Sequence, residues 1–173
     1  MSMKYILLII GFIGVGLTLL FIWGMSLPEE KTYTKKFIFK SPVEKVWNTM
    51  NDLQGQVKWR TDIKDIKIIS NSPEVWIEYP KQGPEIKFKT KSKEKFKLWE
   101  MEIIENPSLS GNWVGSFEST NEGGTSVTFV EKPFISNAFM RVFAHLFIDM
   151  DKSMELYLKN LQNALGENNE SAK

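Results

Sequence analysis

The stretch FIFKSPVEKVW at positions 37–47 says most about how this chain folds. Aromatic residues alternate with other residues up to Phe39, which predicts a strand over residues 33–39. The SPVE sequence that follows is a capping box with proline at the first helical position, and apolar residues then recur at helical spacing as far as Met50. The stretch therefore predicts a strand that leads directly into a short amphipathic helix.

Short elements and turns follow this helix up to residue 133. A second short helix is expected around residues 53–59, although Gly55 weakens it. Six candidate strands come next, separated by turn sequences rich in Asn, Ser, Pro and Gly: 63–69, 74–79, 85–90, 95–104, 112–119 and 125–132. Because the connections are too short for parallel crossovers, we expect an antiparallel meander.

A long C-terminal helix is expected over about residues 137–165, followed by a disordered tail at residues 167–173. Gly166 is well placed to end the helix. From Phe139 to Ile148 the helix is apolar on nearly every side, and such a helix requires burial all round. We expect its outer surface to touch a membrane, a partner or a second copy. Scattered exposed apolar residues are the alternative, which is common in soluble proteins.

An uncharged apolar stretch occupies residues 5–27. As a helix rising about 1.5 Å per residue it extends roughly 34 Å, enough to cross a bilayer core of about 30 Å. Tyr5 and Trp23 lie near its two ends, where amphipathic rings favour the headgroup region. A cleaved signal peptide is the alternative, but its apolar region is usually only about 7–15 residues long. We therefore expect a retained membrane anchor at residues 1–28.

Two signals disagree about which side of the membrane holds the rest of the chain. The positive-inside rule favours the cytoplasm, because four lysines follow the span. These are Lys31, Lys35, Lys36 and Lys40. In contrast, a very short N-terminal flank usually stays inside and sends the rest of the chain across. We lean towards an extracytoplasmic domain, and the orientation stays undetermined.

Charge and composition argue against several classes of function. The chain has 22 lysine and arginine residues against 21 acidic ones, and since Lys4 precedes the span, the remainder is electrically neutral. Nucleic-acid-binding proteins usually carry a basic excess, so we expect no nucleic-acid partner. The chain has no cysteine and only one histidine, His145, so we expect no metal site. His145 falls off the apolar stripe, in a surface ladder with Arg141 and Asp149. No phosphate-binding or dinucleotide motif occurs in a fitting context, and we expect no cofactor.

The order of elements resembles the START-like, or helix-grip, superfamily (SRPBCC). This superfamily includes polyketide cyclase-like proteins, the birch-pollen-allergen fold and coenzyme Q-binding chaperones. The resemblance is carried by residues 37–39 and 41–47, by Trp59 and by GGTSV at 123–127. A leading span that ends in Leu27-Pro28 is similar to a membrane-anchored branch of that superfamily.

This resemblance covers about residues 32–165 and implies an α+β fold. An N-terminal transmembrane helix would be followed by a START-like domain at residues 29–166. The domain would consist of a seven-stranded antiparallel curved sheet around a long C-terminal helix, with two short helices after the first strand.

The same resemblance implies a cavity between sheet and helix that accepts lipids, sterols, quinones or polyketides. Inward-facing residues of the strands and of the helix would line it. The expected lining residues are Ile77, Tyr79, Phe88, Phe96, Leu98, Trp113, Phe117, Phe129, Phe139, Phe143 and Met150. The alternative is that these side chains fill an ordinary core without a void.

Lysine occupies every second position over residues 87–97. The series is Lys87, Lys89, Lys91, Lys93, Lys95 and Lys97. One interpretation is the solvated outer face of a hairpin, which also discourages edge-to-edge aggregation. The more specific interpretation is contact with anionic lipid headgroups beside a membrane anchor.

The expected strand at 95–104 contains a conflict between its two faces. Phe96 and Leu98 fit one inner face, whereas Trp99 and Met101 fit the opposite one, and a β-bulge near Leu98 would reconcile them. Without a bulge, Glu100 points into the interior, where burial would raise its pKa and suit it to general acid catalysis. Glu100 is therefore the candidate catalytic residue, although surface glutamate is far commoner.

Together these features predict a membrane-anchored protein that binds a hydrophobic ligand and performs no covalent chemistry. The ligand would be a lipid, a quinone or a polyketide-like molecule, bound by apolar burial and oriented by a few polar groups. One alternative is a cyclase or dehydratase-type enzyme that uses an interior carboxylate. The other is an envelope scaffold that uses the fold only as an interaction surface.

Overall fold

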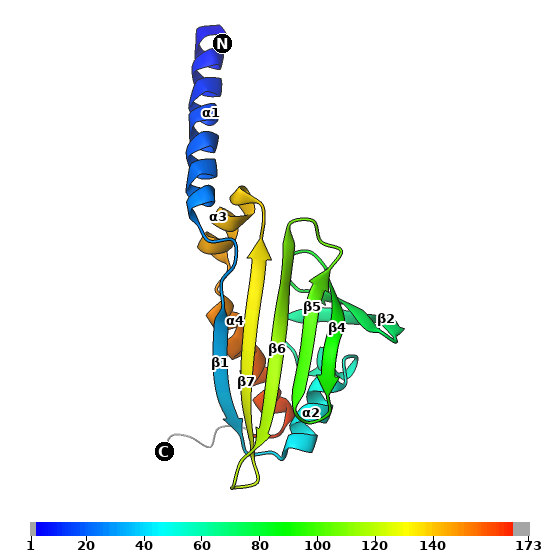
Figure 1. Cartoon of the computed structure of the whole chain (residues 1–173). Coiled ribbons are helices and arrows are strands. Elements are labelled where there is room, and N and C mark those ends of the chain that lie inside the picture. Colours follow the sequence, from blue (N-terminus) through cyan, green and yellow to red (C-terminus); the bar gives the residue numbers. More distant parts are fainter. Residues whose placement is uncertain (1–2, 168–173) are drawn as a thin grey trace.

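The computed structural model describes residues 3–167 (Figure 1). A long apolar helix projects from one end of a curved sheet, the last helix lies along that sheet, and a shorter helix lies at the base of the long one. The elements are α1 (Met3–Ser26), β1 (Tyr33–Phe39), α2 (Val43–Asn51), η1 (Gly55–Lys58), β2 (Ile63–Asn71), β3 (Glu74–Pro80), β4 (Ile86–Glu94), β5 (Leu98–Ile104), β6 (Leu109–Ser119), β7 (Thr125–Ile135), α3 (Ala138–Phe147) and α4 (Met150–Ala164).

The seven strands form one antiparallel sheet in the order β1-β7-β6-β5-β4-β3-β2. From β2 to β7 each strand pairs with the next along the chain, which confirms the predicted meander. The first strand pairs with the last, in a register that runs from Tyr33 opposite Glu131 to Phe39 opposite Thr125. The helix-grip architecture predicted from the sequence is therefore confirmed.

The core lies between the concave face of the sheet, α2 and α4. Its fully buried side chains include Trp76, Trp99, Phe39, Phe129, Met50 and Leu161. A row of aromatic rings crosses the sheet over strands β3 to β7, with ring centroids 5.0 to 5.9 Å apart. The row runs Phe88, Trp76, Trp99, Trp113 and Phe129. Such rings bury large apolar areas, so they tie neighbouring strands together.

The predicted single C-terminal helix is interrupted at Ile148 and Asp149, where the backbone is extended. The Asp149 carboxylate accepts a hydrogen bond from the Lys152 amide at 3.1 Å, which caps the start of α4. The prediction of one continuous helix over residues 137–165 is therefore wrong. The apolar stripe runs through the break, so periodicity alone could not locate it.

The segment just before α2 is held by the far end of the chain. The predicted capping box is wrong, because the N-cap residue is Pro42 and no side chain of the helix caps it. Instead, Glu167 accepts hydrogen bonds from the amides of Lys40 and Ser41 at 2.9 and 2.7 Å. Glu167, which the sequence placed in a tail, is therefore held in place, and residues 168–173 of that expected tail lie outside the described residues.

Among residues 3–167, α1 is the one helix long and apolar enough to span a membrane by length and composition. A signal sequence near an N-terminus has the same properties. Tyr5 and Trp23 lie near the two ends of α1, as predicted, and both are exposed. The contacts that α1 makes with the rest of the protein are concentrated in its last turns, which pack against α3. There the Phe21 and Phe139 ring centroids are 5.8 Å apart.

Arg141 fixes this junction between α1 and α3. It is buried, and its Nε donates a hydrogen bond to the Gly24 carbonyl at 2.8 Å. Its Nη1 pairs with Glu29 at 2.7 Å and also donates to the carbonyls of Ile135 and Ser136 at 3.1 Å. The predicted surface ladder of Arg141, His145 and Asp149 is therefore wrong, since Arg141 points inward and Asp149 caps α4.

Candidate ligand cavity

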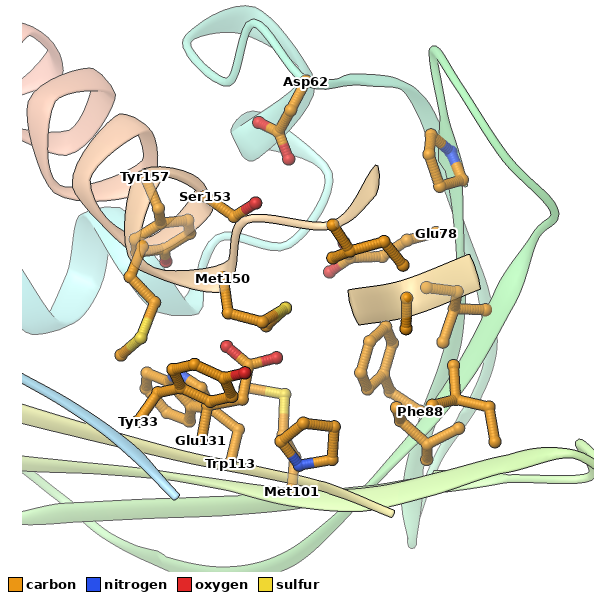
Figure 2. Close-up of a pocket in the computed structure, with 18 of the residues that line it drawn as sticks. Tyr33, Asp62, Glu78, Phe88, Met101, Trp113, Glu131, Met150, Ser153 and Tyr157 are labelled. Carbon is orange, nitrogen blue, oxygen red and sulfur yellow. The ribbon is translucent and has the colours of Figure 1, made fainter. Parts of the chain in front are cut away.

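A cavity of about 450 Å³ lies between the concave face of the sheet and the C-terminal helices (Figure 2). Pockets that bind small molecules commonly have volumes of roughly 300–1,000 Å³. Most of the wall is apolar. Its aromatic and methionine lining residues include Trp76, Phe88, Trp99, Met101, Trp113, Phe129, Met150 and Met154.

Four of the residues predicted to line the cavity lie on its wall: Phe88, Trp113, Phe129 and Met150. They come from strands β4, β6 and β7 and from the first residue of α4. Figure 2 shows Met150 on the helix side of the cavity, opposite Trp113 of the sheet. Strand alternation predicts the inward direction of Phe88, Trp113 and Phe129, and the apolar helical stripe predicts that of Met150.

The predicted inner face of β3 is wrong by one residue. Trp76 and Glu78 line the cavity, whereas Ile77 and Tyr79 do not. The register explains the result, because Trp76 lies opposite Phe88, which itself lies opposite the cavity-lining Ile103. Since β3 carries apolar residues on both faces, its sequence alternation does not identify the inner one.

The face conflict at the start of β5 is resolved by a turn instead of the predicted bulge. The strand begins only at Leu98, and Phe96 sits in the preceding hairpin turn at φ 65°. The Phe96 ring packs against Trp47, with centroids 6.1 Å apart, and not against the cavity. Trp99, Met101 and Ile103 then face inward, so Leu98 lies outside the cavity wall.

Glu100 is consequently not an interior acid. It lies on the outer side of β5, and its Oε1 pairs with the Lys91 ammonium at 3.0 Å. The proposed role of Glu100 as a general acid is wrong, because its carboxylate lies outside the cavity, is 27% exposed and is paired with that lysine.

The remaining predicted lining residues belong to other surroundings. Phe117 is buried in the core, where its ring lies between Trp47 and Phe129 at centroid distances of 5.1 and 6.2 Å. Phe139 and Phe143 of α3 face outward and are 44% and 49% exposed. The break between α3 and α4 accounts for this difference, because α3 does not continue the inward-facing stripe of α4.

The lysine series does not form a single face. The register of β4 shifts between Thr90 and Ser92, so the Lys93 ammonium lies over the inward-facing Trp99 ring at 4.6 Å. Three members form ion pairs: Lys87 with Glu105 at 2.7 Å, Lys91 with Glu100 at 3.0 Å and Lys93 with Glu74 at 2.6 Å. Lys89 lies opposite Glu102, and Lys95 and Lys97 belong to the turn beside α2, at the end of the sheet away from α1.

An ionisable cluster in the cavity wall was missed at the sequence level. Its centre is Arg60, which bonds Asp62 at 2.5 Å, Glu78 at 2.9 Å and Gln56 at 3.0 Å. The guanidinium carbon also lies 5.3 Å from the centre of the Tyr157 ring. Burial opposes the charge on Arg60, but the carboxylates of Glu78 and Asp62 outweigh it and raise the pKa of the guanidinium.

Glu131 of β7 points into the cavity from the sheet (Figure 2). Burial raises the pKa of its carboxyl to about 7; nearby Glu78 adds to the effect, and Arg60 opposes it. Burial also raises the pKa of the Tyr157 hydroxyl, so that hydroxyl stays protonated. Near neutral pH the cavity therefore offers a permanent hydroxyl donor and a carboxyl that both donates and accepts hydrogen bonds.

The sequence contained a signal for Glu131 but not for Arg60. Val127 and Phe129 occupy alternate positions of β7 that face inward, and Glu131 is the next position in this series. A charged residue at an inward-facing position marks a polar group in an apolar wall. Arg60 and Asp62 lie in the segment between η1 and β2, where no periodicity reports the direction of a side chain.

One end of the cavity reaches the base of α1. This end is lined by Leu27 and Pro28, which follow α1, by Ala144 of α3, and by Ile148 in the break between α3 and α4. Tyr157 lies two helical turns beyond Met150, so the wall extends well along α4 from that end. Within residues 3–167, no group of three or more His, Asp or Glu side chains is arranged to hold a metal ion.

No protein-family profile matches this chain, and no curated protein matches it in sequence. Several solved structures match its fold. The Zhui aromatase/cyclase from Streptomyces sp. R1128 has 9% identity and a TM-score of 0.66, over 79% of this chain and 94% of that one. A START superfamily protein from Mycobacterium smegmatis has 11% identity and a TM-score of 0.65, over 79% and 97%.

Norcoclaurine synthase from Thalictrum flavum, solved with dopamine and hydroxybenzaldehyde, is also similar. It has 11% identity and a TM-score of 0.63, over 87% of this chain and 94% of that one. At such low identities these similarities show a shared fold alone.

Proposed function

We propose that this chain, which has the START-like helix-grip fold, is a membrane-anchored protein that binds a hydrophobic small molecule or lipid. The observation that carries the proposal is the cavity of about 450 Å³ behind the sheet. Proteins normally fill their interiors to crystal-like density, so a space of this size lined by large apolar side chains favours a ligand over an ordinary core.

The wall supports a ligand that is apolar over most of its surface. Burying apolar surface contributes about 25 cal/mol per Å², and the aromatic row from Phe88 to Phe129 provides a wide apolar contact area. Binding would therefore be driven by apolar burial.

The polar cluster supports a neutral polar group on that ligand. The charge of Arg60 is already balanced by Asp62 and Glu78, and Glu131 adds a further carboxyl. A carboxylate or phosphate brought into this cavity would meet an excess of acidic groups, which is unfavourable in a desolvated site. A hydroxyl or carbonyl group could instead bond Glu131 or Tyr157.

The helix α1 supports a location at the membrane. Its length suits a bilayer core, and it would keep the cavity beside a lipid reservoir at high effective concentration. The side of the membrane is testable because the chain has no cysteine. A cysteine introduced by Ser119→Cys, probed with a membrane-impermeant thiol reagent on intact cells, is labelled only if the domain is extracytoplasmic.

The function is tested by isolating the full chain in polymer-bounded patches of its native membrane and identifying the small molecules that accompany it. Ser153→Trp places a large side chain into the cavity from α4, whereas Leu156→Trp changes an exposed residue outside the cavity wall. We expect one apolar species to be enriched in the wild type and in Leu156→Trp, and lost in Ser153→Trp. Equal small-molecule contents in all three proteins contradict ligand binding, because lipids around α1 are common to all of them.

A cyclase or dehydratase-type enzyme remains the second candidate, and Glu131 favours it in place of Glu100. A carboxyl with a pKa of about 7 is matched to proton transfer near neutral pH, and it shares the cavity with Tyr157. Once the bound species is identified, mass spectrometry of its mixture with the protein detects conversion. Loss of conversion in Glu131→Gln with unchanged binding supports the enzyme, and absence of any conversion by the wild type contradicts it.

A further inference from the structure

The helix α3 exposes a large apolar surface. Six bulky apolar side chains on and just after it are between 44% and 72% exposed: Phe139, Met140, Phe143, Leu146, Phe147 and Ile148. On the opposite side Ala138, Arg141 and Val142 are buried. Contiguous exposed patches of this kind mark a surface that is covered in the working protein.

This surface is continuous with that of α1. The ring of Phe139 lies beside Phe21, with centroids 5.8 Å apart, and Gly24 packs directly on Ala138. The rings of Trp23 and His145 also meet edge to face, with centroids 5.9 Å apart. If α1 crosses a bilayer, Trp23 marks the headgroup level at its end, and α3 lies at the same depth. Figure 1 shows α3 at the base of α1.

The position of α3 is fixed by buried polar contacts. Arg141 bonds the carbonyl of Gly24 at the end of α1 and the carbonyls of Ile135 and Ser136 at the end of β7. A cation is also favourable at the C-terminal end of a helix dipole, which is where Arg141 meets α1. The apolar face of α3 is therefore held beside the anchor and does not swing freely.

We infer that α3 is an interfacial helix whose exposed apolar face lies in the lipid, at the boundary between headgroups and acyl chains. The inference rests on the membrane anchoring proposed above. Ala144 and Ile148, on and just after α3, and Pro28 after α1 also line the cavity, so the bilayer meets the cavity at this helix. A ligand would then pass between lipid and cavity without crossing water.

The inference is tested on the full chain, reconstituted in phosphatidylcholine vesicles with single introduced cysteines that carry an environment-sensitive fluorophore. The test positions are Phe143→Cys and, as a second variant on the same face, Phe147→Cys. Val15→Cys reports the middle of α1, and Ser119→Cys reports the end of the sheet far from α3. We expect lipids with a quencher on the acyl chain to quench positions 143, 147 and 15 severalfold more strongly than position 119.

The other outcomes separate this inference from the proposed anchoring. If position 15 is quenched while 143 and 147 respond like 119 and remain open to aqueous iodide, α3 is not in lipid and only the anchoring stands. If 143 and 147 are shielded from both quenchers, a second copy or another protein covers α3, which also overturns the inference. If position 15 is unquenched, the anchoring itself is wrong.

Discussion

The Nε of Arg141 donates a hydrogen bond to the carbonyl oxygen of Gly24 at 2.8 Å, across 117 residues of sequence. Carbonyls in the last turn of a helix have no partner within that helix. The Gly24 carbonyl accepts one long hydrogen bond from the Leu27 amide at 3.3 Å, and Arg141 supplies a second, shorter one. The apolar helix and the sheet domain are therefore joined by defined hydrogen bonds as well as by the chain between them.

Replacing Arg141 with methionine should loosen this junction. The carbonyls of Ile135 and Ser136 would lose the Arg141 donor, and that of Gly24 would keep only the Leu27 amide at 3.3 Å. Losing hydrogen bonds to buried groups costs about 1–3 kcal/mol. Hydrogen exchange measured by mass spectrometry should accelerate at residues 24–29 and 138–147. Glu29→Gln is the matched control, because Glu29 is more than half exposed and its pair contributes at most about 1 kcal/mol. Equal exchange in the two variants would contradict a structural role for Arg141.

Adding a side chain at Gly24 should separate α1 from α3. A Cβ at this position would collide with the Ala138 carbonyl, whereas one at Gly14 meets nothing within 4 Å. In a protein carrying Phe21→Cys and Phe139→Cys, we expect a short bifunctional thiol reagent to cross-link the two helices. Gly24→Leu should slow this reaction severalfold and Gly14→Leu should not. An unchanged rate in Gly24→Leu would show that the contact is absent in solution.

Glu131 should make the protein less stable as the pH rises. Its pKa is raised in the folded state, from an ordinary 4.5 to about 7, so the folded state holds a proton that the unfolded state loses between these values. Stability is full below about pH 4.5 and falls by up to about 3 kcal/mol as the pH rises through 7.

The variant Glu131→Gln removes this dependence, because glutamine resembles the protonated carboxyl and does not titrate. Denaturant unfolding should show little difference from the wild type near pH 4 and a more stable variant at pH 8. Glu118→Gln, at an exposed site on β6, serves as the control. A stability difference that does not grow with pH would contradict the burial of the Glu131 charge.

Arg60→Met should destabilise the fold more than Arg60→Lys. Methionine leaves Glu78 without its cation, which costs roughly 3 kcal/mol for a broken buried pair. Lysine keeps the charge but loses the planar set of donors that reaches Asp62, Glu78 and Gln56 together. Arg60→Lys should therefore recover only part of the stability that Arg60→Met loses. Because Arg60 lowers the pKa of Glu131, the pH-dependent loss of stability should also move to higher pH in Arg60→Met. An unmoved midpoint would contradict the coupling of these two groups.

The element order could be predicted because it depends on local signals. Alternation up to Phe39, helical spacing after Pro42 and the turns between strands all act within a few residues. The inner face of β3 could not be predicted, because both of its faces carry apolar or aromatic residues: Val75, Ile77 and Tyr79 on one and Trp76 on the other. Only the pairing of Trp76 with Phe88 decides the matter.

Long-range contacts account for the other differences. The break before α4 depends on the capping carboxylate of Asp149, within an apolar stripe that has neither glycine nor proline there. Arg60 and Glu131 come from distant segments, and only the folded sheet brings them to one cavity. The hydrogen bond from the Ser41 amide to Glu167, just before α2, likewise joins residues 126 positions apart, which no local pattern reports.

The pairing of β1 with β7 has a consequence for biosynthesis. Strand β1 is made directly after α1 but its partner is the last strand of the sheet, and Glu167, which closes on Ser41, is made later still. Non-local pairing of this kind cannot begin until the late segment is available. The nascent domain must therefore stay open until β7 and the segment up to Glu167 have left the ribosome, with its first strand waiting unpaired directly behind α1.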